Sequence, residues 1–348
     1  MLTYLRKIRK SLIDSGSARR YFFYAIGEIA LVVIGIMIAL YFNNLNQDRI
    51  NEKKIKATLV EIQSDIATDI RFSMLTTYRY LQRDSVKNLL FNNELTADDI
   101  KSGRFPHVRA AFRYDPMLIR SNGYDRLILD IDDIPKKYNE LVNSLNIQYK
   151  SRKPYLEGLS KRFIEDCFKN QNIRNHLDWY GRDVFTGEIS DQQIDYYLND
   201  PEFKELAIGM SYNAESLFRA ITSYRVQALN SYFIIEDLLG EETLETPNWI
   251  RKTTLADAEQ AQRLRGSYRL INGPTNTAFG KVFEITSEGK QLYVKLNNGE
   301  AQLLYAWHPE KLEFFTERGG SLIRFPTDSS DKLTIVHGSP NNTIWEKK

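Results

Sequence analysis

An apolar run of 22 residues, from Tyr21 to Phe42, constrains this chain more than any other feature of its sequence. Glu28 is the only acidic or basic residue within it. At 1.5 Å per residue, a helix of this length is about 33 Å long, which is enough for the hydrocarbon core of a bilayer at about 30 Å. Buried helices of soluble proteins are usually shorter and rarely apolar on every face, and cleaved signal peptides end their shorter apolar cores at small residues. Residues 21–43 are therefore predicted to span a membrane.

The basic residues on either side of the run predict its orientation. Six precede it and four follow within a similar distance: Arg6, Lys7, Arg9, Lys10, Arg19 and Arg20, then Arg49, Lys53, Lys54 and Lys56. Because cytosolic flanks carry the excess of Lys and Arg, the N-terminus is expected in the cytosol, with residues 1–20 as a basic tail that contacts membrane lipid. We therefore expect a single-pass protein of a bacterial inner membrane with its C-terminal domains in the periplasm.

The lone carboxyl group of Glu28 needs an explanation, because a charge near the centre of a membrane helix costs about 2.5–3.5 kcal/mol. On a helical wheel Glu28, Gly35 and Ala39 lie within about 40° of one another. Gly35 and Ala39 have the spacing of small residues that lets two membrane helices approach closely. This face is predicted to associate with another helix, most simply in a homo-oligomer. Two alternatives stay open: Glu28 handles protons against a polytopic partner, or its side chain reaches the interface without a special role.

The composition and the motifs of the chain argue against several classes of function. The net charge of +2 argues against a nucleic-acid-binding protein, and the single cysteine, Cys167, excludes an intrachain disulfide and a zinc–cysteine cluster. The four histidines are scattered. No glycine-rich phosphate loop occurs, and the sequence around Ser211 lacks the second glycine of a nucleophile elbow. The acidic run at residues 130–133 is interpreted as a solvated loop, with a weak Ca²⁺ site as the alternative. We expect no metal, no cofactor and no catalytic residue, although an enzyme is not excluded.

Apolar residues at steps of three and four predict a mostly helical domain over residues 44–250, arranged as an elongated antiparallel bundle. No Gly or Pro occurs between Gly35 and Gly103, so one helix is expected from the membrane to about Phe91. The apolar residues along one side of this helix could form a coiled coil between protomers. Helices are also predicted over 138–163, with a kink at Pro154, and over 212–239.

Shorter signals predict where other elements begin and end. Thr96-x-x-Asp99 and Ser190-x-x-Gln193 are typical of helix starts, and Asn122-Gly123 indicates a turn. Residues 251–265 are predicted to form a connector helix capped by a Thr-x-x-Asp box at 254–257.

From residue 266 to 348 the period of the apolar residues changes to two. Eight short runs separated by turn residues predict an antiparallel meander, closed into a small barrel or strongly curled. Large aromatic and polar side chains in this β domain are candidates for a ligand or partner surface: Tyr305, Trp307, His308 and Trp345. Core packing or docking against the helical domain is the alternative use of these residues. The fold class is thus α+β, with one transmembrane helix, a helical bundle and a small antiparallel β-barrel-like domain.

The N-terminal segments "RKIRKSL" and "YAIGEIALVVIGIMIALYFNNLNQDR" resemble the signature of a family of small single-span membrane proteins of unknown function, common in Bacteroidota. The matching positions are Gly27, Glu28, Gly35, Asn43 and Asn44. Leu45 and Gln47 stand where the family more often has an aromatic residue and an acid. The resemblance covers about the first 50 residues, continues weakly to about residue 240 and leaves the β domain outside. It implies location and architecture, and no activity.

Together these features predict a non-enzymatic, membrane-anchored scaffold, sensor or interaction protein. The first alternative is an accessory single-span subunit of an ion-driven envelope complex that uses Glu28, with another envelope protein as its partner. The second alternative is a periplasmic ligand-binding protein that uses the β domain.

Overall fold

The computed structural model of the chain describes the following residues: 18–102, 117–129, 131, 134–247, 249–250, 258–289, 291–296, 299, 301–308, 312–316, 321–327, 331–337 and 342–348. Three predictions concern residues outside these ranges: most of the basic tail at 1–20, the acidic run at 130–133 apart from Ile131, and the helix cap at 254–257. The side chain of His308 also lies outside the described part of the structure.

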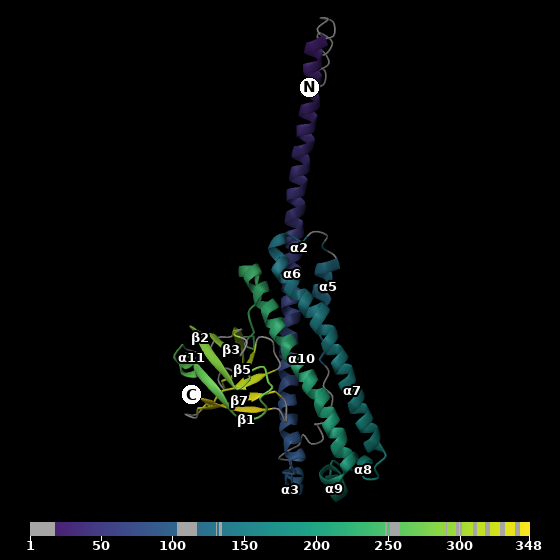
Figure 1. Cartoon of the computed structure of the whole chain (residues 1–348). Coiled ribbons are helices and arrows are strands. Elements are labelled where there is room, and N and C mark those ends of the chain that lie inside the picture. The colour runs from purple at the N-terminus through teal and green to yellow at the C-terminus, as the bar shows by residue number, and fades with distance from the viewer. Residues whose placement is uncertain are drawn as a thin grey trace. The chain divides into compact units, whose positions relative to one another are not determined.

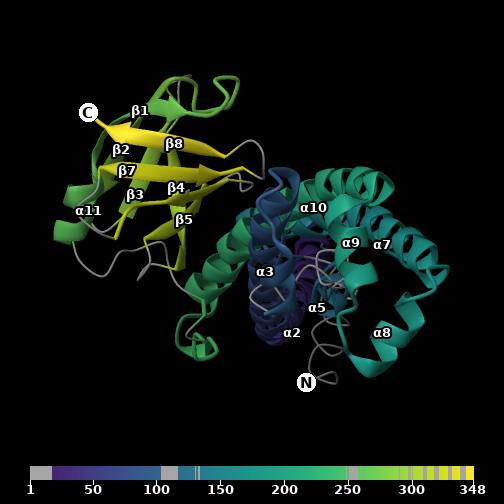
Figure 2. The ribbon, with the colours of Figure 1, turned by 90° about the horizontal axis from the view of Figure 1, so that it is seen from below.

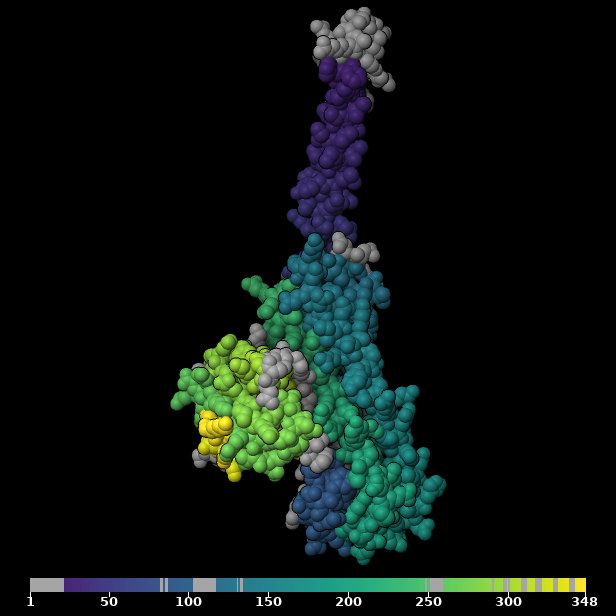
Figure 3. Space-filling model, viewed as in Figure 1, coloured from purple at the N-terminus to yellow at the C-terminus, as the bar shows by residue number. Residues whose placement is uncertain are grey.

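One helix, α2 (Ala18–Phe91), continues for 74 residues and confirms the predicted long helix that ends near Phe91 (Figure 1). Among the described residues it is the one helix that is long and apolar enough to cross a bilayer. Its most apolar 18-residue window has a mean hydropathy of 2.4 and is 0% buried. Figure 3 shows the surface of this segment in purple. α2 runs through two compact units of the chain, which divide at Ala57 and Thr58.

The second unit begins with the buried stripe of α2, in which Leu59, Ile62 and Ile66 are at most 1% exposed. Its other described helices are α3 (Ala97–Lys101), α5 (Asn122–Leu129), η1 (Lys136–Tyr138), α6 (Asn139–Asn146), η2 (Ile147–Arg152), α7 (Lys153–Asn175), α8 (Tyr180–Thr186), α9 (Asp191–Asn199), α10 (Pro201–Leu239), η3 (Gly240–Glu242) and α11 (Ala258–Leu264). α10 packs against α7, α6 and η2. This part of the chain is therefore helical, as the 3.6-residue period predicts.

Two predicted helix starts are confirmed by their caps. The hydroxyl of Thr96 and the carboxylate of Asp99 form a reciprocal capping box at α3, and the hydroxyl of Ser190 accepts a hydrogen bond from the Gln193 amide at α9. α10 begins 11 residues before the predicted start at 212, because the Asp200 carboxylate accepts from the Phe203 amide and caps the helix there.

The predicted turn at Asn122-Gly123 is wrong, because α5 begins at Asn122. Gly123 serves close packing instead: a Cβ at this position would lie 2.8 Å from Cγ1 of Ile62. At the predicted kink the chain forms the π-helical turn η2, and Pro154 follows as the second residue of α7. At this position the missing N–H of proline removes no bond from α7, whose first amides have no partner within that helix.

All eight predicted strands are present and form a closed antiparallel barrel in sequence order (Figure 2). They are β1 (Gly266–Asn272), β2 (Val282–Glu288), β3 (Gln291–Lys295), β4 (Ala301–His308), β5 (Glu313–Thr316), β6 (Leu322–Arg324), β7 (Lys332–Val336) and β8 (Thr343–Lys347). β1 pairs with both β2 and β8, which closes the barrel. Closure removes the exposed edges that an open sheet would present to other chains.

The interior of the barrel is filled with side chains. Trp345, Phe283 and Phe314 belong to a cluster of buried apolar residues, and Trp345 packs edge-on against Phe283 with ring centroids 4.7 Å apart. Leu264 of α11 belongs to the same cluster, and its carbonyl accepts a hydrogen bond from the hydroxyl of Tyr268 at 2.9 Å. A filled interior is one of the two forms that barrels of eight strands take, the other being a ligand cavity.

Candidate functional site

Polar side chains are buried where α2, α6–η2 and α10 meet, which is unusual because each must be paired inside the protein. They are Gln63, Asp69, Ser73 and Thr77 on α2, Ser144 and Gln148 on α6–η2, and Thr222, Ser223, Tyr224 and Ser231 on α10. We call this set the polar seam.

A carboxylate lies at the centre of the polar seam. The side chain of Asp69 is 0% exposed, and its Oδ2 accepts a hydrogen bond of 2.8 Å from the hydroxyl of Tyr224. The backbone amide of Arg120 donates to the same oxygen at 3.3 Å, and Nη1 of Arg120 lies 3.3 Å from Oδ1. Gln148 in turn donates from Nε2 to the hydroxyl of Tyr224 at 3.1 Å. The carboxylate thus holds together segments that are far apart in the sequence.

Burial shifts the pKa values of the ionisable side chains around Asp69. It raises the pKa of Asp69 to about 6, and the hydrogen bonds from Tyr224 and Arg120 oppose the shift only in part. Burial, and then the charge of Asp69, holds the pKa of Tyr224 and that of Tyr149 well above the usual value. Near neutral pH the carboxyl group of Asp69 therefore titrates, while both phenols remain protonated and the hydroxyl of Tyr224 keeps donating to Asp69.

The π-helical turn η2 places two consecutive residues, Gln148 and Tyr149, in the interior. A π-turn adds a residue to a helical turn and is frequent at functional sites. The ring of Tyr149 stacks on Tyr124 at 4.6 Å, and the Tyr124 hydroxyl donates to Asn146 at 2.7 Å. Within the described residues, the Tyr149 hydroxyl and Oε1 of Gln148 have no hydrogen-bond partner. The site can therefore exchange a proton at Asp69 and has polar atoms that are still unsatisfied.

α10 uses a second face to contact the outside of the barrel. The guanidinium carbon of Arg225 lies 4.9 Å from the centre of the Trp307 ring on β4, and the hydroxyl of Tyr305 donates to Oδ1 of Asn230. Arg225 is 2% exposed, and its Nε and Nη1 have no acceptor among the described residues. Burial lowers the pKa of Arg225 to about 10, which leaves the side chain charged at neutral pH.

The four candidate residues of the β domain do not form one surface. Trp345 is 0% exposed inside the barrel, whereas Tyr305 and Trp307 are buried on the outside of β4, where they contact α10. The side chain of His308 is outside the described residues.

The three candidate residues of the apolar segment lie on α2, where Glu28, Gly35 and Ala39 are exposed. Apart from its chain neighbours and the backbone of α2, no heavy atom of the described residues lies within 4 Å of a Cβ built at Gly35. Within one copy of the chain, this face is therefore open to another helix.

A second buried titratable group was missed by the sequence reasoning. Nδ1 of His337 lies 3.0 Å from the hydroxyl of Ser321, and burial, followed by the charge of Arg219, lowers the pKa of His337 to about 4. Asp69 was also missed, although its sequence position carries a signal. It is an acidic residue within the apolar stripe of α2, next to Ile70 and three residues after Ile66.

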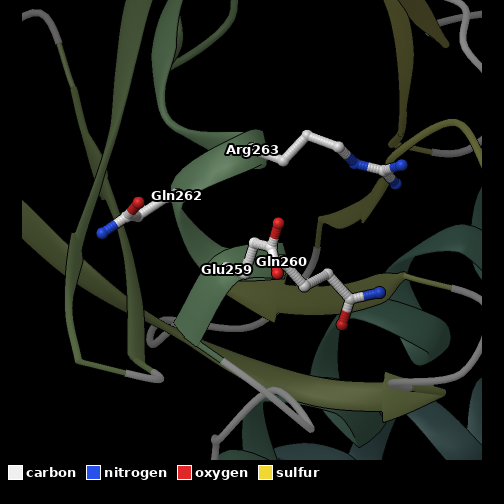
Figure 4. Close-up of a pocket in the computed structure, with 4 residues that line it drawn as sticks. All are labelled: Glu259, Gln260, Gln262 and Arg263. Carbon is white, nitrogen blue, oxygen red and sulfur yellow. The ribbon is translucent and has the colours of Figure 1, made fainter.

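A polar hollow of about 580 Å³ borders α11 and is lined by Glu259, Gln260, Gln262 and Arg263 (Figure 4). In Figure 4 the side chains of Gln262 and Arg263 point in different directions. The hollow therefore does not gather its polar groups around one point, and it includes none of the predicted site residues.

Among the described residues, no group of three or more His, Cys, Asp or Glu side chains is arranged to hold a metal ion. None of the family models, curated proteins or solved structures compared with this chain matches it. The resemblance of the N-terminal segment to a Bacteroidota family thus stays a prediction.

Proposed function

We propose that the protein is a non-enzymatic interaction protein, anchored in a bacterial inner membrane by α2, with its helical part and barrel in the periplasm. The observation that carries the proposal is the continuity of α2. One helix contains an apolar window that is 0% buried and, from Leu59 onward, a stripe that is buried in the second unit. Apolar surface of this extent is costly in water and stable in lipid.

The filled interior of the barrel favours an interaction protein over a ligand carrier. Its interior is occupied by a continuous cluster that includes Trp345, Phe314 and Ile335, each 0% exposed. A barrel that carries a ligand keeps part of this volume open. The external side chains of β4 contact α10 instead, so the barrel is joined to the helices of its own chain.

The location is tested by alkaline carbonate extraction and cysteine labelling. In a Cys167→Ser background, Ser11→Cys reports on the N-terminal tail and Lys161→Cys on an exposed position of α7. We expect a membrane-impermeant maleimide to label Lys161→Cys in spheroplasts and Ser11→Cys only after lysis. Release of the protein by carbonate, or the reverse labelling pattern, contradicts the proposal.

Oligomerisation through Glu28, Gly35 and Ala39 is tested by native mass spectrometry of the full-length protein extracted from its own membranes. Gly35→Leu is expected to disperse a homo-oligomer, because a large side chain separates helices that meet at small residues. Gly27→Leu, on a different face of the helix and also without a neighbour within 4 Å, is the matched control. Equal behaviour of both variants counts against this face.

A second candidate function is that of an accessory subunit in an ion-driven envelope complex. It is favoured by the exposed carboxyl group of Glu28 on the apolar segment, because an acidic residue in a membrane helix is energetically costly and commonly has a functional role. Co-purification of a polytopic protein that is lost in Glu28→Gln, while the protein still inserts, would select this function over self-association.

A further inference from the structure

Arg225 is a buried cation that has no counter-ion among the residues that the structure describes. The residue is 2% exposed, and Nε and Nη1 have no hydrogen-bond acceptor within the described part of the chain. Burial lowers the pKa of Arg225, and no carboxylate of the described residues contributes to this shift. Two other arginines have partners: Arg219 of α10 pairs with Glu215 at 2.6 Å, and Arg152 of η2 donates to the hydroxyl of Ser223.

An unpaired guanidinium in the interior is costly, because burial removes its hydration and no protein group replaces it. Native structures pair almost all buried polar groups, and an exception indicates an ion or water that completes the site or a functional role. Arg225 lies where α10 contacts β4, so a group that completes its hydrogen bonds would lie beside that contact.

The geometry around Arg225 indicates what kind of partner fits. Trp307 covers one face of the guanidinium group at 4.9 Å, and a cation–π contact of this kind uses the face and leaves the N–H groups in the plane of the group available. Donors that lie in this plane suit the oxygens of a carboxylate or phosphate. The aromatic ring also fixes the orientation of the plane, which reduces the entropy lost on binding.

We propose that Arg225, held by Trp307, binds a small oxyanion, a carboxylate or a phosphate, at the contact between α10 and β4. This site goes beyond the proposed anchoring role and does not depend on where the protein is located. The oxyanion would neutralise the buried charge and accept hydrogen bonds from N–H groups of Arg225 that lack an acceptor among the described residues.

The test uses the full-length protein in mild detergent and measures the thermal unfolding midpoint against sodium phosphate and sodium acetate, with sodium chloride at matched ionic strength. A ligand that binds only the folded state raises the midpoint, by roughly 5 °C at a hundredfold excess over its dissociation constant. We expect a saturable rise with phosphate or acetate and no comparable rise with chloride. The anion that acts at the lower concentration identifies the preferred chemistry.

Three variants show whether Arg225 is responsible. Arg225→Met removes the charge at similar length, so the shift should be lost while the midpoint without anion stays equal or rises. Arg225→Lys keeps the charge without the planar donors, so the anion concentration needed for half of the shift should rise at least tenfold. Arg162→Met, at an exposed position of α7, should respond as the wild type does.

Several results would overturn the site. One is a wild-type midpoint that responds to phosphate and acetate no more than to chloride, as expected if water completes the interior around Arg225. Another is an unchanged oxyanion response in Arg225→Met or, if that variant does not fold, in Arg225→Lys. Native mass spectrometry adds an independent readout, because a small anion retained from the cell should appear as an adduct on the wild type and not on Arg225→Met.

Discussion

The substitution Asp69→Asn tests whether the buried carboxyl group makes stability depend on pH. Asparagine has nearly the same shape and still accepts from the hydroxyl of Tyr224, but it does not titrate. Since Asp69 is 0% exposed and is held by Tyr224 and Arg120, the variant changes the charge at this position with little change in packing.

The size of the effect follows from the pKa of Asp69, which burial raises from 3.8 to about 6 in the folded protein. The folded state thus binds the proton more tightly than the unfolded state. One pKa unit is worth about 1.4 kcal/mol, so protonation of Asp69 stabilises the fold by about 3 kcal/mol. This stabilisation is fully present below about pH 4 and is lost as the pH rises through about 6.

The assay is urea unfolding of the full-length protein in mild detergent, followed by helical circular dichroism between pH 4 and pH 8. The unfolding free energy of the wild type minus that of Asp69→Asn should rise by about 2.5 kcal/mol as the pH falls across this range. Asp178→Asn, at an exposed position, is the control and should give a flat difference. A flat or oppositely sloped difference for Asp69→Asn would refute the assignment of a raised pKa to this carboxyl group.

Other predictions concern packing and the second buried titratable group. Gly123→Ala should destabilise the helical part by about 1–3 kcal/mol in the same urea assay, because the added Cβ would lie 2.8 Å from Ile62. Gly158→Ala is the control and should be neutral or slightly stabilising, because a Cβ there meets no neighbour within 4 Å. Burial lowers the pKa of His337 to about 4, so relative to His337→Gln the wild type should lose about 3 kcal/mol of stability as the pH falls from about 6.5 to about 4. Unfolding followed by tryptophan fluorescence measures this difference. Equal stability of the two proteins at every pH would contradict the prediction. Trp345→Ala should cost about 3–5 kcal/mol in thermal unfolding, because the ring fills the barrel interior, and a loss below 1 kcal/mol would mean that the interior is not close-packed.

Local signals in the sequence determined the elements. The stripe of apolar residues without Gly or Pro predicts α2 as far as Phe91, and the structure ends it there. The alternation of period two predicts all eight strands, and side-chain caps mark α3 and α9. Each of these signals depends on residues within a few positions of one another, where helix and strand geometry repeats.

The misread turn at Asn122-Gly123 shows where local signals are insufficient. A glycine after asparagine usually marks a turn, because both residues tolerate a left-handed backbone. Here Gly123 is helical, and the reason for a residue without a Cβ is the closeness of Ile62 on a different helix. Packing against a distant segment is not encoded in the neighbouring residues.

The candidate sites were decided by the tertiary structure. Tyr224 and Asp69 are 155 positions apart and form a hydrogen bond only because α10 packs beside α2. Arg225 comes to face Trp307 in the same way. The sequence also left a closed barrel and a curled sheet as alternatives, since closure depends on pairing the first strand with the last. Periodicity specifies which face of an element is buried, whereas its partner, and therefore the pKa and the pairing of each buried polar group, is specified only when the elements pack together.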